Sequence, residues 1–283
     1  MVVVEVPFRL HIKGDAAEQH ELQAYDGYSS LAGFSLTLAL VTNYVQTGKI
    51  RHRGNFDGRM SVRAIPIQEG SVVSDFVVRM AKVAVGGLLP NSPEAVSALL
   101  VDLTKRTIDR NLGIIPTPQT DALKALEGES KSGGDLEALV AATDASVRQT
   151  HQMIGSGAKL VDIYGGTKRL ARYDLDSKAY VNGTITSEQV QEKDVSVASF
   201  NVNSGYGGVF DFDLGRVVPI MVNRDTLINA KSVLTWGIDQ YAKGTGKKIT
   251  LRFRPILALD NTVKKYLVID ARIPPDELSE ILG

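Results

Sequence analysis

The sequence predicts an α+β protein of two domains: an N-terminal mixed domain with a helical extension, followed by a small antiparallel β-barrel domain that carries one helix. Three observations predict this class. The first half mixes period-two strand patterns with helical stripes, a Gly/Ser segment at 155–157 follows a long helical pattern, and short strand patterns separated by turns dominate the remainder. We therefore expect the N-terminal domain to span residues 1–157 and the C-terminal domain residues 158–283.

The chain begins with a strand pattern. Apolar and polar residues alternate from Val2 to Lys13, which is typical of a half-buried strand. Gly14 and Asp15 have turn chemistry, so residues 19–25 are expected to return as the second strand of a hairpin. A helix follows: Ser29 or Ser30 is a candidate cap, the apolar stripe recurs every three to four residues, and Gly48 marks its end.

The segment after this helix holds the densest cluster of like charge in the chain. It predicts a basic hairpin with arms at 49–53 and 60–67 and a turn at 54–58. Alternate strand residues share a face, so the cations of the first arm would align and bind an anionic ligand. Two alternatives are a charged edge strand that resists aggregation and a protein interface. The candidate ligand-binding residues are Lys49, Arg51, Arg53, Arg59 and Arg63.

The next segments are mostly helical. Residues 71–90 lack a clear period, and the sequence leaves strand and helix both open there. Ser92 followed by Pro93 predicts a helix start, because serine caps helices and proline is favoured at the first helical position. Residues 113–120 predict a connector, and an amphipathic helix is expected from 135 to 154.

Short strands with intervening turns fill the last part of the chain. One helix, beginning after Asn223, interrupts them. Closing such strands into a barrel removes exposed sheet edges, which favours a small barrel. The predicted strands are 179–186, 195–202, 209–212, 216–222, 248–257 and 263–273.

Two phrases of the sequence resemble a known group of proteins. They are Asn43–Arg51, near the start, and Asn201–Gly208, which continues into Gly215–Pro219. The chain resembles uncharacterised prokaryotic and phage-borne proteins that pair an N-terminal α+β domain with a C-terminal five-stranded β-barrel. The resemblance covers most of the chain and supports the two-domain organisation. It implies no function and no catalytic residue.

Composition limits the function classes. The chain has 283 residues, 43% of them hydrophobic and 23% charged, with 32 basic and 32 acidic residues and no cysteine. This balance argues against general binding to nucleic acids or membrane surfaces, and the lack of cysteine excludes disulfides and thiol nucleophiles. The most apolar segment, Phe76–Leu89, contains Arg79 and Lys82 and is too short to span a bilayer. We expect a soluble cytoplasmic protein without a membrane span.

Catalytic and metal-binding patterns are sparse. Asp211 and Asp213 have strand spacing and would project the same way, as paired carboxylates do in hydrolases. The four histidines are scattered without the spacing of a helical metal site. The sequence therefore predicts no metal and no cofactor.

Three functional hypotheses follow. The first is a non-enzymatic interaction or ligand-binding protein that engages an anionic partner, a nucleotide or nucleic acid, through the basic hairpin. The second is a self-assembling structural component of a phage-defence or counter-defence system, with a homo-oligomer or a protein partner. The third is an unrecognised hydrolase using Asp211 and Asp213. Whether the protein is an enzyme stays open, although the lack of a catalytic constellation favours the first hypothesis.

Overall fold

The chain forms two compact units in a computed structural model. The first unit comprises residues 1–124 and 139–182, and the second comprises 125–138 and 183–283. Each unit contains its own sheet. The structure describes residues 3–51, 56, 59–65, 72–81, 92–114, 120–128, 133–258 and 261–275.

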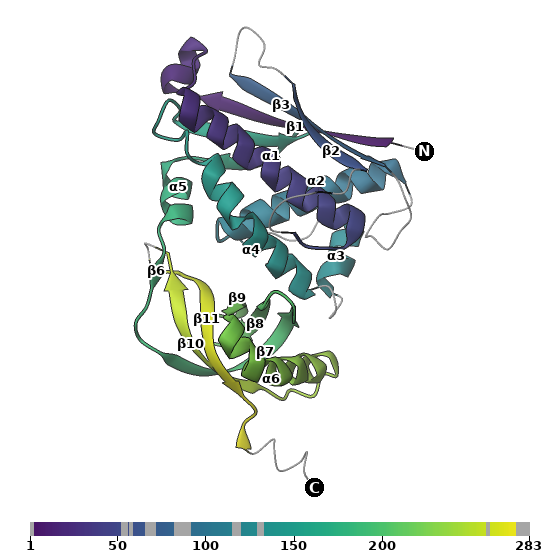
Figure 1. Cartoon of the computed structure of the whole chain (residues 1–283), viewed down its shortest axis with the longest axis vertical. Coiled ribbons are helices and arrows are strands. Elements are labelled where there is room, and N and C mark those ends of the chain that lie inside the picture. Colours follow the sequence, from purple (N-terminus) through teal and green to yellow (C-terminus); the bar gives the residue numbers. More distant parts are fainter. Residues whose placement is uncertain are drawn as a thin grey trace. The chain divides into compact units, whose positions relative to one another are not determined.

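The first unit is built on a five-stranded antiparallel sheet with the order β2-β3-β1-β4-β5, of which Figure 1 labels β1, β2 and β3. The predicted first strand is confirmed, and the segment left open in the sequence contains a strand. The predicted hairpin partner at 19–25 is wrong, because β1 is a central strand whose two neighbours are β3 and β4. The strands are β1 Val3–Lys13, β2 Met60–Ile65, β3 Val73–Ala81, β4 Leu160–Gly165 and β5 Lys168–Tyr173.

The predicted end of α1 and start of α2 are confirmed, but the predicted cap at Ser29 or Ser30 is wrong, because α1 begins at Ala24 and contains both serines. Gly48 follows α1 with a φ of 65°, the left-handed conformation that glycine adopts without steric cost. The Ser92 hydroxyl accepts a hydrogen bond from the Ala95 N–H at 3.1 Å and caps α2, with Pro93 at the first helical position. These elements are the 3-10 helix η1 Asp15–Gln19 and helices α1 Ala24–Thr47, α2 Pro93–Asn111, α3 Asp121–Gly128, α4 Gly133–Thr150 and α5 Leu175–Asn182.

The helices of the first unit cover one face of its sheet. Helix α1 contacts β2 and β3, and α2 contacts β1 and β5. Phe34 of α1 packs edge-to-face against Phe8 and Phe76, with ring centroids 6.4 and 5.2 Å away. The residues of β1 that face these helices are buried, whereas the alternate residues are half-buried or exposed. One face of the sheet therefore carries the core and the other is open.

The second unit contains a closed five-stranded barrel, which confirms the predicted fold class. Its sheet has the order β11-β9-β8-β7-β10-β6, and β11 also pairs with β10. The pairing of β9 with β11 is parallel, a departure from the antiparallel expectation, while the other pairs are antiparallel. The elements are β6 Ile185–Thr186, β7 Gln191–Phe200, β8 Tyr206–Asp211, β9 Arg216–Val222, α6 Arg224–Ala242, β10 Ile249–Leu257 and β11 Val263–Arg272.

Helix α6 closes the core of the barrel by packing on β7 and β11. Ala230 and Leu234 of this helix are fully buried, and Trp236 is partly buried against the same core. The turn before β8 requires Gly205: its φ is 75°, and a Cβ there would lie 2.5 Å from the carbonyl oxygen of Val222.

The first unit continues to Asn182, past the position after Gly157 at which the sequence predicted a domain boundary, and the second unit also takes in residues 125–138. The Gly/Ser segment is a turn from α4 into β4, and β4 pairs with β1 along Phe8–Lys13. The predicted strand at 179–186 is also wrong for most of its length, because α5 continues to Asn182. No helix in the described part of the chain has the length and apolar character needed to cross a bilayer.

Candidate anion-binding face of the first sheet

The uncovered side of the first sheet, here called the open face, is rich in charge. Directly paired residues of an antiparallel sheet project to the same side, and Arg9 is paired with Asp75 of β3 and with Tyr164 of β4. His11 is likewise paired with Asp162. Among the described residues of the strands, cations outnumber carboxylates on this face. The cations are Arg9, Lys13, Arg63, Arg79, Arg169 and Arg172, and the carboxylates are Glu5, Asp75 and Asp162.

Two of the predicted site residues lie at the β2 edge of the sheet. Arg63 is exposed and paired with Val77 of β3, which places it on the open face. Arg59 is exposed just before β2, and its carbonyl accepts a hydrogen bond from the Ala81 N–H at 2.9 Å. The structure therefore brings these two arginines to the same edge strand.

The first arm of the predicted hairpin is wrong as far as the structure describes it. Lys49 and Arg51 are exposed but not in a strand, and β2 pairs with β3 instead. The end of α1 holds this segment: Asn43 Nδ2 donates to the Lys49 carbonyl at 2.8 Å, and the Lys49 N–H donates to Thr47 Oγ1 at 3.2 Å. Arg53 lies outside the described residues.

Two simple ion pairs lie on the open face. The Arg9 guanidinium donates to both oxygens of Asp75, at 2.6 and 3.0 Å. Arg79 Nε lies 2.7 Å from Glu5 Oε1. Each of these carboxylates neutralises one arginine, and solvent-exposed pairs of this kind contribute little to stability. Among the described residues, Arg63, Lys49 and Arg51 form no ion pair.

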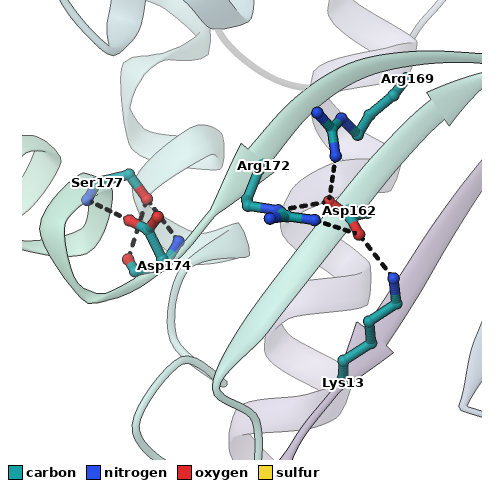
Figure 2. Close-up of polar contacts among 6 residues, drawn as sticks. All are labelled: Lys13, Asp162, Arg169, Arg172, Asp174 and Ser177. Carbon is teal, nitrogen blue, oxygen red and sulfur yellow. Dashed lines mark hydrogen bonds and ion pairs between the residues drawn. The ribbon is translucent and has the colours of Figure 1, made fainter.

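Asp162 has a different environment, because three cations surround one buried carboxylate (Figure 2). Its side chain is 1% exposed. Arg172 donates from Nε at 2.8 Å and from Nη2 at 3.2 Å, and Lys13 Nζ donates at 2.8 Å. Arg169 Nη1 lies 3.8 Å from the same carboxylate. We call these four residues the Asp162 cluster.

The cations of the cluster keep Asp162 ionised. Burial alone would raise the pKa of its carboxyl, but the hydrogen bonds from Arg172 and Lys13 outweigh burial and lower the pKa to about 2. Close to this group, burial lowers the pKa of His11, and the charge of Lys13 lowers it further. At neutral pH the cluster carries more positive than negative charge.

A buried histidine lies at the end of α4, next to the start of α5. His151 Nδ1 donates to the Val147 carbonyl at 2.8 Å, and Nε2 lies 3.1 Å from the Ser177 hydroxyl, which also donates to the Asp174 carbonyl at 3.0 Å. Ser177 and Asp174 also exchange hydrogen bonds: the Ser177 N–H donates to Asp174 Oδ1, and the Asp174 N–H donates to Ser177 Oγ (Figure 2). This reciprocal pair is a capping arrangement that starts α5. The contact between Ser177 and His151 is therefore part of the structure at the start of α5.

The carboxylates of the hydrolase hypothesis occupy a structural turn. Asp211 is buried, and its Oδ1 accepts from the backbone N–H groups of Asp213 and Leu214 at 2.9 and 3.0 Å. Its Oδ2 accepts from Tyr266 at 2.5 Å and Lys193 at 3.0 Å. Burial would raise the pKa of Asp211, but these hydrogen bonds lower it, so the group is a poor general acid.

Metal ligands are not clustered in the described part of the chain: no group of three or more His, Asp or Glu side chains there could hold an ion. The Asp162 cluster was missed at the sequence level because its members come from distant strands. One local signal was present: Asp162 interrupts an apolar strand pattern between Val161 and Ile163. A carboxylate inside such a pattern indicates a buried partner.

Comparison with known proteins gives a family and no function. A family model described as a domain of unknown function (DUF7946) matches residues 8–182, and one described as a family of unknown function (DUF7947) matches residues 189–272. The first covers more than half of the chain, so the protein belongs to that family. The resemblance to an uncharacterised family is confirmed at this level. No curated protein and no solved structure matches the chain.

Proposed function

We propose that the protein is a non-enzymatic binding protein whose first unit engages an anionic partner, a nucleotide or a nucleic acid. The open face, with Arg59 at its β2 edge, forms the binding surface together with Lys49 and Arg51 of the segment that follows α1. The observation that carries the proposal is the excess of partly exposed cations over carboxylates, counted over the described residues, on a sheet face that no described helix of its own unit covers. Concentrated charge of one sign attracts ligands of the opposite sign.

Arg63 and Arg51 are the residues of the original prediction best suited to a test. Both are exposed, and neither forms an ion pair with a described residue, so their removal breaks no ion pair within the part of the chain that the structure describes. Substitutions at such positions usually change stability by about 0.5 kcal/mol or less. A lost charge-assisted hydrogen bond to a ligand costs roughly 1.5–3 kcal/mol, about tenfold or more in affinity.

The test is the affinity of an Arg51→Ala, Arg63→Ala double variant for a fluorescein-labelled single-stranded oligothymidylate and for ATP, measured by anisotropy and calorimetry. The matched control is Arg252→Ala, Arg254→Ala, which removes two exposed strand arginines from the second unit. We expect the first variant to bind at least tenfold more weakly at an unchanged melting temperature, and the control to bind like the wild type. Wild-type binding should weaken as salt rises.

Equal losses in the two variants would show that net charge alone attracts the probe and would overturn the assignment to the open face. Unchanged affinity in the Arg51→Ala, Arg63→Ala variant would overturn it as well. A large fall in melting temperature for that variant would identify these arginines as structural.

We also propose a cytoplasmic location, a prokaryotic or phage origin and a homo-oligomeric state. The absence of cysteine, which suits a reducing compartment, supports the location. The resemblance of Asn43–Arg51 and Asn201–Gly208 supports the origin and, through it, a self-assembling role in phage defence or counter-defence. Solution mass by light scattering tests the oligomeric state, and a monomer at micromolar concentration would overturn it.

A further inference from the structure

We propose that the Asp162 cluster is a binding position for the terminal phosphate of a phosphate monoester such as a mononucleotide. This inference rests on the proposed function, since it places a defined ligand group within the open face. It assigns the contacts to Lys13, Arg169 and Arg172, with Asp162 as the residue that positions them.

The cluster holds hydrogen-bond donors that its own carboxylate does not use. An arginine has five N–H donors, and Arg172 directs only Nε and Nη2 toward Asp162. Lys13 has three N–H donors and makes one hydrogen bond to Asp162. Arg169 approaches at 3.8 Å, which is an ion pair without a short hydrogen bond. Donors therefore remain for a second anion.

These donors are accessible. The side chains of Lys13, Arg169 and Arg172 are 39%, 53% and 46% exposed, whereas that of Asp162 is 1% exposed. The buried carboxylate lies between the three cations, and its contacts restrain them (Figure 2). Restraining a side chain before binding lowers the entropy lost when a ligand arrives.

The charge of the cluster selects the class of anion. Three cations around one carboxylate leave a net charge of two positive. A phosphate monoester carries about 1.5 to 2 negative charges at neutral pH, which matches this surplus, whereas a phosphodiester carries about one. The simple pairs on the same face, such as Arg9 with Asp75, have no such surplus.

An aromatic side chain lies beside the cluster on the same strand. Tyr164 follows Asp162 by two residues, so both project to the open face, and it is paired with Arg169 of β5. Its ring is half-buried. Aromatic rings beside cationic groups provide stacking surfaces for nucleobases, which favours a nucleotide over a simple sugar phosphate.

The test compares AMP, cyclic AMP and adenosine by calorimetry, because the three share a base and differ in phosphate charge. We expect AMP to bind at least tenfold more tightly than cyclic AMP, and adenosine to show no measurable binding. Arg169→Gln should weaken AMP binding at least tenfold, because it removes one of the proposed phosphate contacts. Its melting temperature should not change, because the contact of Arg169 with Asp162 is the longest of the three. Arg148→Gln, on helix α4 of the same unit and neutralised by Asp144, is the matched control and should change affinity less than twofold.

The possible outcomes separate this inference from the proposed function. Equal affinities for AMP and cyclic AMP, or equal effects of Arg169→Gln and Arg148→Gln, would overturn the monoester position. If AMP fails to bind while the oligothymidylate binds in a manner that depends on Arg63, the position is wrong and the open face stands. If neither probe binds the wild-type protein, both proposals fail. Arg172→Gln provides a second variant. Its melting temperature is recorded alongside its affinity, because Arg172 donates two hydrogen bonds to Asp162 and its loss also affects the stability of the fold.

Discussion

Acid should destabilise the first unit through His151. The imidazole is fully buried, stacks on Tyr173 with ring centroids 3.8 Å apart, and is hydrogen-bonded at both nitrogens. Burial lowers its pKa to about 4, although the hydrogen bond to the Val147 carbonyl and the charge of Asp174 oppose the shift. The nearby charge of Lys178 lowers the pKa further. The folded state therefore favours the neutral ring.

The sign and size of the effect follow from this pKa. The unfolded chain takes up a proton near the ordinary histidine value of about 6.5, whereas the folded protein does so only near 4. The stability contributed by the neutral ring is thus complete above about pH 6.5 and falls as the pH drops toward 4. At about 1.36 kcal/mol per unit, lowering the pH from 7 to 5 should cost roughly 2 kcal/mol.

Urea denaturation at pH 7 and pH 5 measures this effect. With a slope of about 2 kcal/mol per molar urea, the midpoint of the first unit should fall by roughly 1 M. Far-UV circular dichroism follows the helices, and fluorescence of Trp236, the single tryptophan, reports the second unit separately. His151→Gln should be less stable than the wild type at pH 7, because it loses the stacking on Tyr173, but its midpoint should depend much less on pH.

Carboxylates titrate in both the wild type and His151→Gln. The decisive quantity is therefore how the difference in unfolding free energy between these two proteins changes with pH. A His151→Gln variant that loses as much stability between pH 7 and pH 5 as the wild type would refute the reasoning. An acid-induced shift confined to the Trp236 signal would refute it equally, since it would place the titrating group in the second unit.

Three further effects are expected. Gly205→Ala should destabilise the second unit by roughly 1–3 kcal/mol, because it adds a Cβ at a positive φ and against the Val222 carbonyl. Gly215→Ala is the control and should cost less, because its Cβ would meet nothing within 4 Å. Equal shifts of the two variants in thermal melts followed by Trp236 fluorescence would contradict this reasoning. Ser92→Ala should cost about 1 kcal/mol in urea denaturation through loss of the α2 cap, whereas an unchanged midpoint would show that the cap is dispensable. The free energy of unfolding of Asp162→Asn should fall less between pH 4 and pH 2 than that of the wild type. The reason is that a carboxyl with a pKa of about 2 contributes stability above pH 4 that disappears toward pH 2. An equal fall in both proteins would assign the loss to other carboxyls.

Local sequence signals predicted much of the fold. Alternation identified β1, Ser92 with Pro93 identified the start of α2, and Gly48 identified the end of α1, because each depends on neighbouring residues. The first unit extends past Gly157 for a non-local reason. The Gly/Ser turn at 155–157 resembles a linker, and only the pairing of β4 with β1, about 150 residues earlier, shows that the first sheet continues past it.

The candidate site was predictable only in part for the same reason. Arg63 was identified because charge density along the chain is visible in the sequence. The Asp162 cluster was not, because Lys13, Asp162 and Arg172 meet through strand register. The structure also separates Lys49 and Arg51 from β2, because the end of α1 uses the Lys49 backbone groups that a hairpin would need.

The most direct measurement of anion binding by the open face is arginine footprinting. Modification by phenylglyoxal, read by peptide mass spectrometry, reports each guanidinium separately with and without AMP or the oligothymidylate. We expect saturable protection of Arg63, Arg169 and Arg172, and unchanged modification of Arg252 and Arg254 in the second unit. Equal modification of the first three with and without ligand, or protection confined to Arg252 and Arg254, would contradict the assignment of anion binding to this face.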